Sequence, residues 1–168
     1  MAEKEQKSSK LHDKLSLLDF KLSSLLEVTK AINSNFPVED LLELYKFILR
    51  EQLGISKLML FTHDEQWVCI LKYGVKGSNK NINVQEDLMR VKEITVIESS
   101  SKDYLNSFDV VIPVFHKDDP LAYLLIGDLD EDELKISPTI KHMPFIQTLT
   151  NIIVVAVENK RLAKENIK

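Results

Sequence analysis

The sequence of 168 residues is poor in cysteine and glycine and has no long apolar run. Its single cysteine, Cys69, excludes an internal disulfide and fits a reducing compartment. No apolar run approaches the roughly 20 residues that a membrane-spanning helix needs. The first ten residues are polar and lack the apolar core of a signal peptide. We therefore expect a cytoplasmic protein that has no membrane partner.

A basic excess is also missing. The formal net charge is -4, which argues against nucleic acid as a main partner, because phosphate binding needs a concentrated basic face. Hydrophobic residues make up 44% and charged residues 29% of the chain, as in ordinary globular proteins. The length is sufficient for one domain with a core of its own.

Motifs for catalysis or metal binding are absent as well. The sequence has no glycine-rich phosphate loop, no nucleophile elbow and no HExxH. None of its histidines (His12, His63, His116 and His142) has a second ligand at metal spacing. The acidic run 128–133 starts like a calcium loop but lacks its glycine and its final glutamate. We expect no enzymatic activity, no metal and no cofactor.

A helical pattern begins at Leu11, after a polar segment over residues 1–10 that we expect to be disordered. Leucines recur in steps of four and three, the spacing of a heptad, at Leu11, Leu15, Leu18, Leu22 and Leu25. Two interpretations remain open at this stage. The helix over residues 11–36 either packs on its own domain or pairs with a second chain.

A second helix is predicted from Pro37 to residue 53. Asn33–Pro37 breaks the first helix, and proline suits the first turn of the next one. Gly54 is a suitable stop. The buried side of this helix is predicted to contain Leu41, Leu44, Tyr45, Ile48 and Leu49.

Short apolar runs predict strands over residues 57–63, 66–73, 94–98, 108–116 and 121–128, with one or two helical turns over 85–91. The last two strands form a hairpin whose turn is 117–120. Both are apolar at nearly every position, so both faces of the sheet should be covered. Pro113 cannot donate to a sheet ladder, and therefore fits best at a bulge or beside an open edge.

The last helix is predicted to start at Ser137–Pro138, and Pro144 predicts a kink or a restart. It then continues through Phe145, Leu149, Ile152 and Ala156 into the polar stretch 158–166. No Gly or Pro ends it, so we expect it to continue in a longer chain. The order of elements predicts an α+β fold: an antiparallel sheet of about five to six strands, with the N- and C-terminal helices on one face.

This order resembles a GAF domain over residues 22–165. The resemblance depends on the first helix pair, the hairpin 57–73, the run 111–114 with its proline, the following strand 121–126 and the long closing helix. The family commonly has a proline at the position of Pro113. It favours glycine near the start of the next strand, where this chain has Ala122.

Residues 94–166 also look like the N-terminal regulatory region of bacterial serine phosphatases of the sporulation and sigma-factor type. The resemblance implies a dimerising or signalling helix over residues 11–36 and a sensor domain over 37–168 that ends in a linker helix. The implied function is a non-catalytic regulatory domain that dimerises and passes a signal to a C-terminal output domain, which we expect to be a serine/threonine phosphatase. The alternative is a degenerate module that binds only other proteins, without a small-molecule ligand.

The resemblance to GAF domains also bears on which small-molecule ligands this chain could bind. Cyclic-nucleotide GAF domains have an Asn-Lys pair, then a phenylalanine followed four residues later by an acidic pair. Here Asn79-Lys80 is present, but its spacing to Phe115 is too long and Phe115 is followed by Asp119-Pro120, so we expect no such ligand. Bilin-binding relatives use a cysteine, but Cys69 lies in a strand and is expected to be buried and unreactive. Any small-molecule ligand is unidentified. A homodimer is expected through Leu11, Leu15, Leu18, Leu22 and Leu25 of the first helix and Phe145, Leu149, Ile152 and Ala156 of the last.

Overall fold

The computed structural model describes residues 2–75, 82–97, 108–127 and 143–167. The helices are α1 (Ala2–Asn33), α2 (Val38–Phe47), α3 (Val84–Asp87) and α5 (Met143–Ile167), and a π-helical turn, η1 (Ile48–Gln52), continues α2. The strands are β1 (Lys57–Asp64), β2 (Gln66–Tyr73), β3 (Thr95–Val96), β4 (Val110–His116) and β5 (Asp119–Gly127).

The five strands form one sheet in the order β2-β1-β5-β4-β3, and every neighbouring pair is antiparallel. The predicted fold class is therefore confirmed. Both predicted hairpins are present, β1 with β2 and β4 with β5. The two hairpins join through β1 and β5, so the apolar strands lie in the centre of the sheet.

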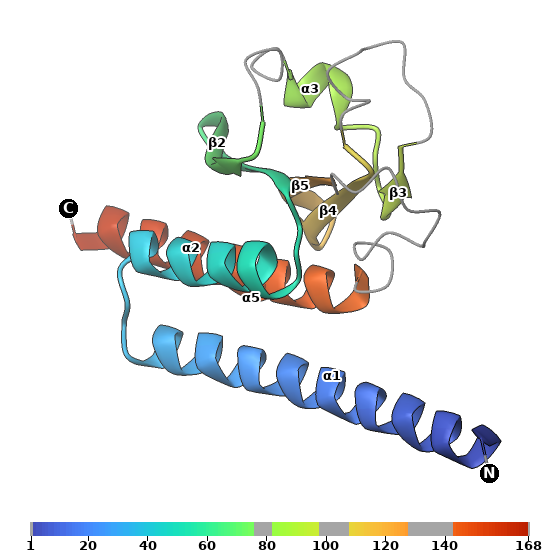
Figure 1. Cartoon of the computed structure of the whole chain (residues 1–168). Coiled ribbons are helices and arrows are strands. Elements are labelled where there is room, and N and C mark those ends of the chain that lie inside the picture. Colours follow the sequence, from blue (N-terminus) through green and yellow to red (C-terminus); the bar gives the residue numbers. More distant parts are fainter. Residues whose placement is uncertain (1, 76–81, 98–107, 128–142, 168) are drawn as a thin grey trace.

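Helices cover one face of this sheet in two layers (Figure 1). α2 and α5 lie next to the strands, and α1 packs on their outer side. The core between them contains Leu60, Ile112 and Leu124 from the sheet, none of which is exposed. The α1 side chains Val28 and Ala31 belong to the same core. The predicted arrangement of terminal helices on one face is thus confirmed.

A smaller apolar cluster covers the other face of the sheet. Alternate residues of β1 and β5, such as Phe61, Tyr123 and Leu125, point away from the helices. Val84 and Leu88, from α3 and its end, pack on them. Because both faces are covered, the central strands are apolar at almost every position.

Two buried tyrosines tie α2 and β2 to the rest of the core. The Thr150 hydroxyl donates to the Ile146 carbonyl at 2.6 Å, so the Tyr45 hydroxyl, 2.7 Å from Thr150 Oγ1, is the donor of that pair. The Tyr73 hydroxyl donates to the carbonyl of Ile55 at 2.9 Å. Burial raises the pKa of both tyrosines above the ordinary value, so both stay protonated inside the fold.

Pro113 and Pro144 lie where their missing N–H groups cost little. Pro113 is in β4, whose partner β3 pairs only with Val110 and Val111. Within the described residues, β4 therefore has no strand beside Pro113 on that side, which resolves the conflict between a proline and a central strand. Pro144 lies in the first turn of α5, where a backbone N–H would have no intrahelical partner.

Two expectations are wrong. Residues 2–10 are helical, because α1 begins at Ala2; this segment is rich in strong helix formers, and Glu3 and Glu5 complement the helix dipole. Cys69 is exposed, because β2 is an edge strand whose outer face extends beyond the apolar cluster. The expected acidic loop 128–133, the helix start at 137–138, Asn79-Lys80 and His142 lie outside the described residues.

Candidate regulatory site

A hollow of about 490 Å³ lies between the end of the β1–β2 hairpin and the start of α3. The hairpin contributes Phe61, His63 and Trp67, and the segment at α3 contributes Asn83 and Val84, together with Glu65, Gln66, Ile82 and Gln85. The Asn83 side chain accepts from the amide of Glu86 and so fixes the first turn of α3. The hollow thus combines one aromatic wall with three side-chain amides and one carboxylate.

The aromatic wall is anchored by Trp67. Its ring lies 5.1 Å from the ring of His63 and 5.4 Å from that of Tyr123. Tyr123 is fully buried, and its hydroxyl donates to Met89 Sδ at 3.8 Å, a weak acceptor. Burial raises the pKa of Tyr123. Because the apolar cluster fills the sheet face behind Trp67, a ligand would lie at the end of the hairpin.

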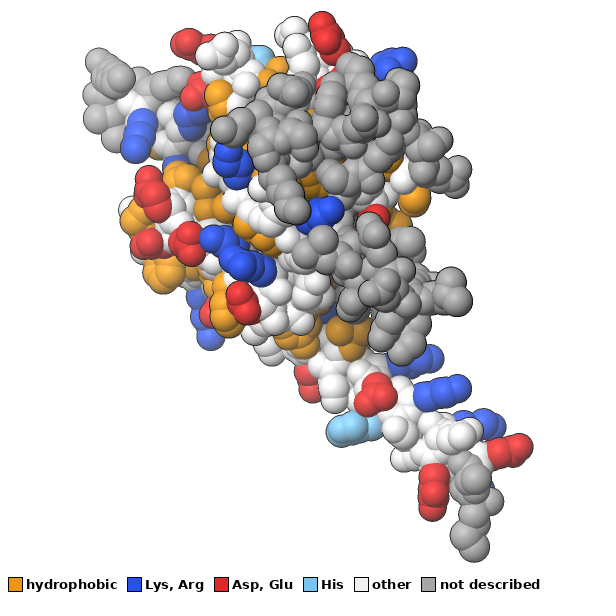
Figure 2. Space-filling view, turned by 45° about the horizontal axis from the view of Figure 1, so that its top comes forward, with side chains coloured by type: hydrophobic (Ala, Val, Ile, Leu, Met, Phe, Trp, Pro, Cys, Tyr) orange, Lys and Arg blue, Asp and Glu red, His pale blue; other side chains and the backbone are white. Residues whose placement is uncertain are grey.

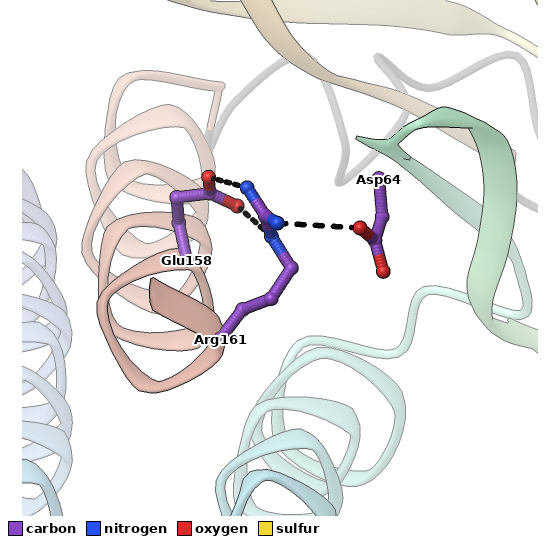
Figure 3. Close-up of polar contacts among 3 residues, drawn as sticks. All are labelled: Asp64, Glu158 and Arg161. Carbon is purple, nitrogen blue, oxygen red and sulfur yellow. Dashed lines mark hydrogen bonds and ion pairs between the residues drawn. The ribbon is translucent and has the colours of Figure 1, made fainter. Parts of the chain in front are cut away.

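The same hairpin is linked to the last helix on its other side. Arg161 Nη1 of α5 lies 3.3 Å from Asp64 Oδ1 at the hairpin end, and the guanidinium also forms an ion pair with Glu158 (Figure 3). Arg161 Nε donates to the second oxygen of Glu158 at 3.1 Å, so the carboxylate fixes the guanidinium plane. Figure 3 shows the arginine reaching from α5 toward the strand, which places one charged contact between helix and hairpin.

A groove of about 260 Å³ runs under this contact. Its apolar lining comes from four elements, α2, β2, β5 and α5, and includes Val68, Leu121 and Val157. Lys160 and Lys164 of α5 lie on its polar side, with Glu39 of α2. His63 lines both this groove and the hollow, so the end of the hairpin separates the two.

Helices α1 and α5 run parallel and in a constant register. Lys160 Nζ donates to Asn35 Oδ1 at 2.7 Å, just after α1, and the rings of Phe20 and Phe145 lie 6.2 Å apart. In both pairs the α5 residue follows its α1-side partner by 125 positions in the sequence. Because α5 begins at Met143, the part of α1 before Leu18 extends beyond it by about 24 Å. Figure 2 shows this part projecting from the rest of the molecule.

The structure divides the residues that the sequence assigned to a dimer interface. Leu11, Leu15, Leu18 and Leu22 are exposed, at 52–59% of their surface. Leu25 and Ile152 are half-buried against the chain's own core. Phe145, Leu149 and Ala156 are buried in that core. Apolar spacing on a helix does not distinguish an internal partner from an external one, so the sequence alone did not separate these three residues from the exposed leucines of α1.

Several residues at this site gave no signal in the sequence. Asp64 and Arg161 are 97 positions apart, and each resembles any other surface charge in the sequence. The sequence predicted that Trp67 lies in a strand, but it did not indicate that this side chain lines a hollow. Among the described residues, no group of three or more His, Cys, Asp and Glu side chains could hold a metal ion. Nor does any helix there have the length and hydropathy that crossing a bilayer requires.

Comparison with known structures gives the name of this architecture. The GAF domain of a Pseudomonas syringae pv. tomato sensor histidine kinase superposes with a TM-score of 0.68 at 12% identity, covering 93% of this chain and 97% of that one. The chain has a GAF fold. No model of a known protein family matches the sequence, and no curated protein does either.

Two further GAF structures support the same fold. One is the GAF domain of an Acinetobacter phosphoenolpyruvate-protein phosphotransferase, with a TM-score of 0.59, 14% identity and coverage of 84% of this chain and 94% of that one. The other is a GAF domain/HD domain protein of Geobacter sulfurreducens, with a TM-score of 0.53, 12% identity and coverage of 78% and 98%. At such identities the matches establish the GAF fold alone, because one fold can serve unrelated functions.

The GAF fold also places the cyclic-nucleotide near-match. Lys117 and Asp118 form the turn between β4 and β5, with Lys117 at a positive φ of 57°. Asp119 and Pro120 open β5 and pair with His116 and Phe115. The predicted hairpin is present, but its turn is shorter than the predicted 117–120, because β5 begins at Asp119.

Proposed function

We propose that this chain is a non-catalytic GAF regulatory domain, which works as a homodimer and passes a signal through α5 to a C-terminal output domain. The ion pair between Arg161 and Asp64 supports this proposal most directly. It joins the last helix to a hairpin whose end lines the hollow. A ligand that moved the hairpin would therefore act on α5 through a charged contact.

A serine phosphatase is the output domain that we propose. The support is the resemblance of residues 94–166 to the regulatory region of bacterial serine phosphatases. The matched structures come from other kinds of signalling protein, a sensor histidine kinase and a phosphotransferase by their descriptions. GAF folds with different outputs are thus similar to this chain, and the phosphatase proposal depends on the sequence resemblance.

An interaction module without a small-molecule ligand is the second candidate. One observation favours it: apolar side chains such as Met59, Val111 and Leu125 fill the sheet face opposite the helices. A small-molecule ligand would therefore bind in the hollow at the hairpin end. If no small molecule occupies it, the hairpin and the helices would respond to a protein partner.

Trp67 allows a direct test, because it is the only tryptophan of the chain and it lines the hollow. We would screen metabolites, including cyclic AMP and cyclic GMP, by tryptophan fluorescence and thermal shift. Binding should raise the melting temperature of the protein. Trp67→Ala should weaken binding, so the same ligand concentration should give a smaller thermal shift in this variant. Val68→Ala, which lines the groove on the other face of β2, is the matched control.

The relay itself is tested by hydrogen exchange on the ligand complex. A ligand of the hollow should slow exchange in the hairpin and change exchange in the last turns of α5. Arg161→Met should abolish the change in α5 and leave the one in the hairpin. Binding without any response of α5 would refute the relay, and failure of every ligand would favour the interaction module.

A further inference from the structure

The groove under the contact between Arg161 and Asp64 differs in chemistry from the hollow. Its apolar lining residues are all aliphatic: Val38, Val68, Ile70, Leu121, Val154 and Val157. Such a wall has no aromatic face, so it would hold a ligand mainly through the burial of apolar surface. A methylene group fills about the volume of a water molecule, about 30 Å³, so the groove of about 260 Å³ has room for about eight carbons.

The side of α5 that lines the groove changes from apolar to cationic along the helix. Val154 and Val157 are followed by Arg161 and then by Lys164, each about one helical turn further on. A charged group placed among the valines would lose its hydration without gaining a partner. The order of these residues therefore suits a ligand with an apolar chain and an anionic head, whose head lies toward the C-terminal end of α5.

Arg161 holds its two carboxylates unequally. Glu158 contacts the guanidinium through both of its oxygens, one of which lies 3.1 Å from Arg161 Nε (Figure 3). Asp64 makes a single contact of 3.3 Å with Nη1, and its side chain is 51% exposed. An exposed single contact of this kind contributes little free energy. A carboxylate that enters the groove could therefore replace Asp64, while Glu158 keeps the guanidinium in place.

The charge of the groove also fits a single anion. Three cations and three carboxylates line it: Lys160, Arg161 and Lys164, and Glu39, Asp64 and Glu158. With Asp64 turned away, the lining keeps an excess of one positive charge, which a monoanion would neutralise. Within the described part of the chain, Lys164 forms no ion pair. It lies one turn beyond Arg161, so the two side chains together could hold both oxygens of a carboxylate.

We propose that this groove binds an aliphatic carboxylate of about eight carbons, with its chain between β2 and α5 and its carboxylate on Arg161 in place of Asp64. Binding would exchange one ion pair for another and release the end of the hairpin from α5. The binding itself goes beyond the proposed function. Its regulatory effect rests on that function, because the ion pair between Arg161 and Asp64 is the proposed link between the hollow and α5.

Calorimetry and thermal shift with sodium octanoate on the intact chain test the ligand class. We expect saturable binding, with an affinity that rises about threefold for each methylene added from butanoate to octanoate, because each one buries apolar surface. Octylamine has the same chain with the opposite charge, and should bind at least about tenfold more weakly. No binding of octanoate, an affinity independent of chain length, or equal binding of octylamine would overturn the inference.

Substitutions on β2 test the place of binding. Val68→Asp puts a carboxylate on the groove wall and should weaken octanoate binding at least about tenfold. Cys69→Asp is the matched control, because the next residue of the strand is also exposed but pairs with Phe61 on the other face of the sheet. Circular dichroism should show both variants folded. An equal loss in both variants would reject the groove, as would a loss in Trp67→Ala with full binding in Val68→Asp.

The exchange of partners at Arg161 is tested by removing the carboxylate that the ligand replaces. Asp64→Asn should tighten octanoate binding about two- to fivefold, because the ligand no longer displaces an exposed ion pair. Asp118→Asn makes the same change in the turn of the other hairpin and should leave the affinity unchanged. In the wild type, octanoate should speed hydrogen exchange at residues 63–67. Equal affinities in all three proteins would refute the exchange. A groove that fails these tests leaves the proposed function standing, since the relay is tested with ligands of the hollow.

Discussion

Arg161 of the last helix forms an ion pair with Asp64 at the end of the first hairpin, across 97 positions of sequence. Glu158 holds the same guanidinium from within the helix. The three side chains connect α5, the core helix that reaches the C-terminal end of the described chain, to the strand pair that borders the hollow. The contact is half-exposed, so its importance is positional more than energetic.

Removing the ion pair should therefore loosen the hairpin with little loss of global stability. We expect Arg161→Met and Asp64→Asn each to lower the free energy of unfolding by about 0.5–1 kcal/mol, with a double variant that adds little further loss. Urea unfolding of the wild type, the two single variants and the double variant gives the coupling energy of the double-mutant cycle. Hydrogen exchange at residues 63–67 should become faster in both single variants. Lys164→Met, at an exposed position of the same groove, should show no coupling to Asp64→Asn.

Alkaline pH should destabilise the fold through its buried tyrosines. Tyrosine in an unfolded chain has a pKa of about 10, and burial raises the pKa of Tyr45 and Tyr73 in the folded state. Both states keep these protons below about pH 9, so stability there does not depend on them. Above that, the unfolded chain releases protons that the folded chain retains, and stability should fall by up to about 1.4 kcal/mol per pH unit for each tyrosine.

The tyrosine variants separate this effect from the lost hydrogen bond. Tyr45→Phe should cost about 1 kcal/mol at pH 8, because the bond to Thr150 is lost while Thr150 still donates to Ile146. Between pH 9 and pH 11, its unfolding free energy should fall less steeply than that of the wild type. An equal slope in both proteins would contradict the assignment of the alkaline effect to Tyr45.

Two glycines should differ sharply in their tolerance of alanine. Gly54 and Gly74 both have a positive φ, of 74° and 68°. A Cβ at Gly54 would meet open space, whereas at Gly74 it would lie 1.8 Å from the carbonyl oxygen of Ser56. Gly54→Ala should cost about 1–2 kcal/mol for the left-handed backbone alone. Gly74→Ala should cost at least about 2 kcal/mol more, measured by urea unfolding, because backbone atoms must move. Comparable losses would contradict the clash.

Cys69 should react in the folded protein, more slowly than an ordinary thiol. The residue is exposed on the edge strand, while its sulfur donates to the Leu71 carbonyl at 3.3 Å. Partial burial raises the pKa of the thiol, and the thiolate is the reactive form. Labelling with a water-soluble thiol reagent at pH 7.5 should therefore proceed without unfolding, and accelerate as the pH rises beyond 9. Complete protection until denaturant is added would show that the thiol is covered.

Local pattern determined much of this fold. Alternating and continuous apolar runs predicted the two hairpins, because strand pairing follows from turn residues between short β-branched segments. Pro37 and Gly54 marked the limits of the second helical segment, since each restricts or frees the backbone in a way that helices use at their ends. The α+β order and the helices on one face followed from the sequence of these elements.

Only the tertiary structure decided which apolar residues the chain itself uses. Leu149 and Leu22 both lie on apolar helical stripes in the sequence, yet the Leu149 side chain is fully buried and Leu22 is 52% exposed. The difference depends on where α1 and α5 lie relative to the sheet, which is a property of packing between distant segments. The same holds for Cys69, whose strand proved to be an edge, and for the contact of Arg161 with Asp64. Residues far apart in sequence meet through the fold, so no local pattern records their pairing.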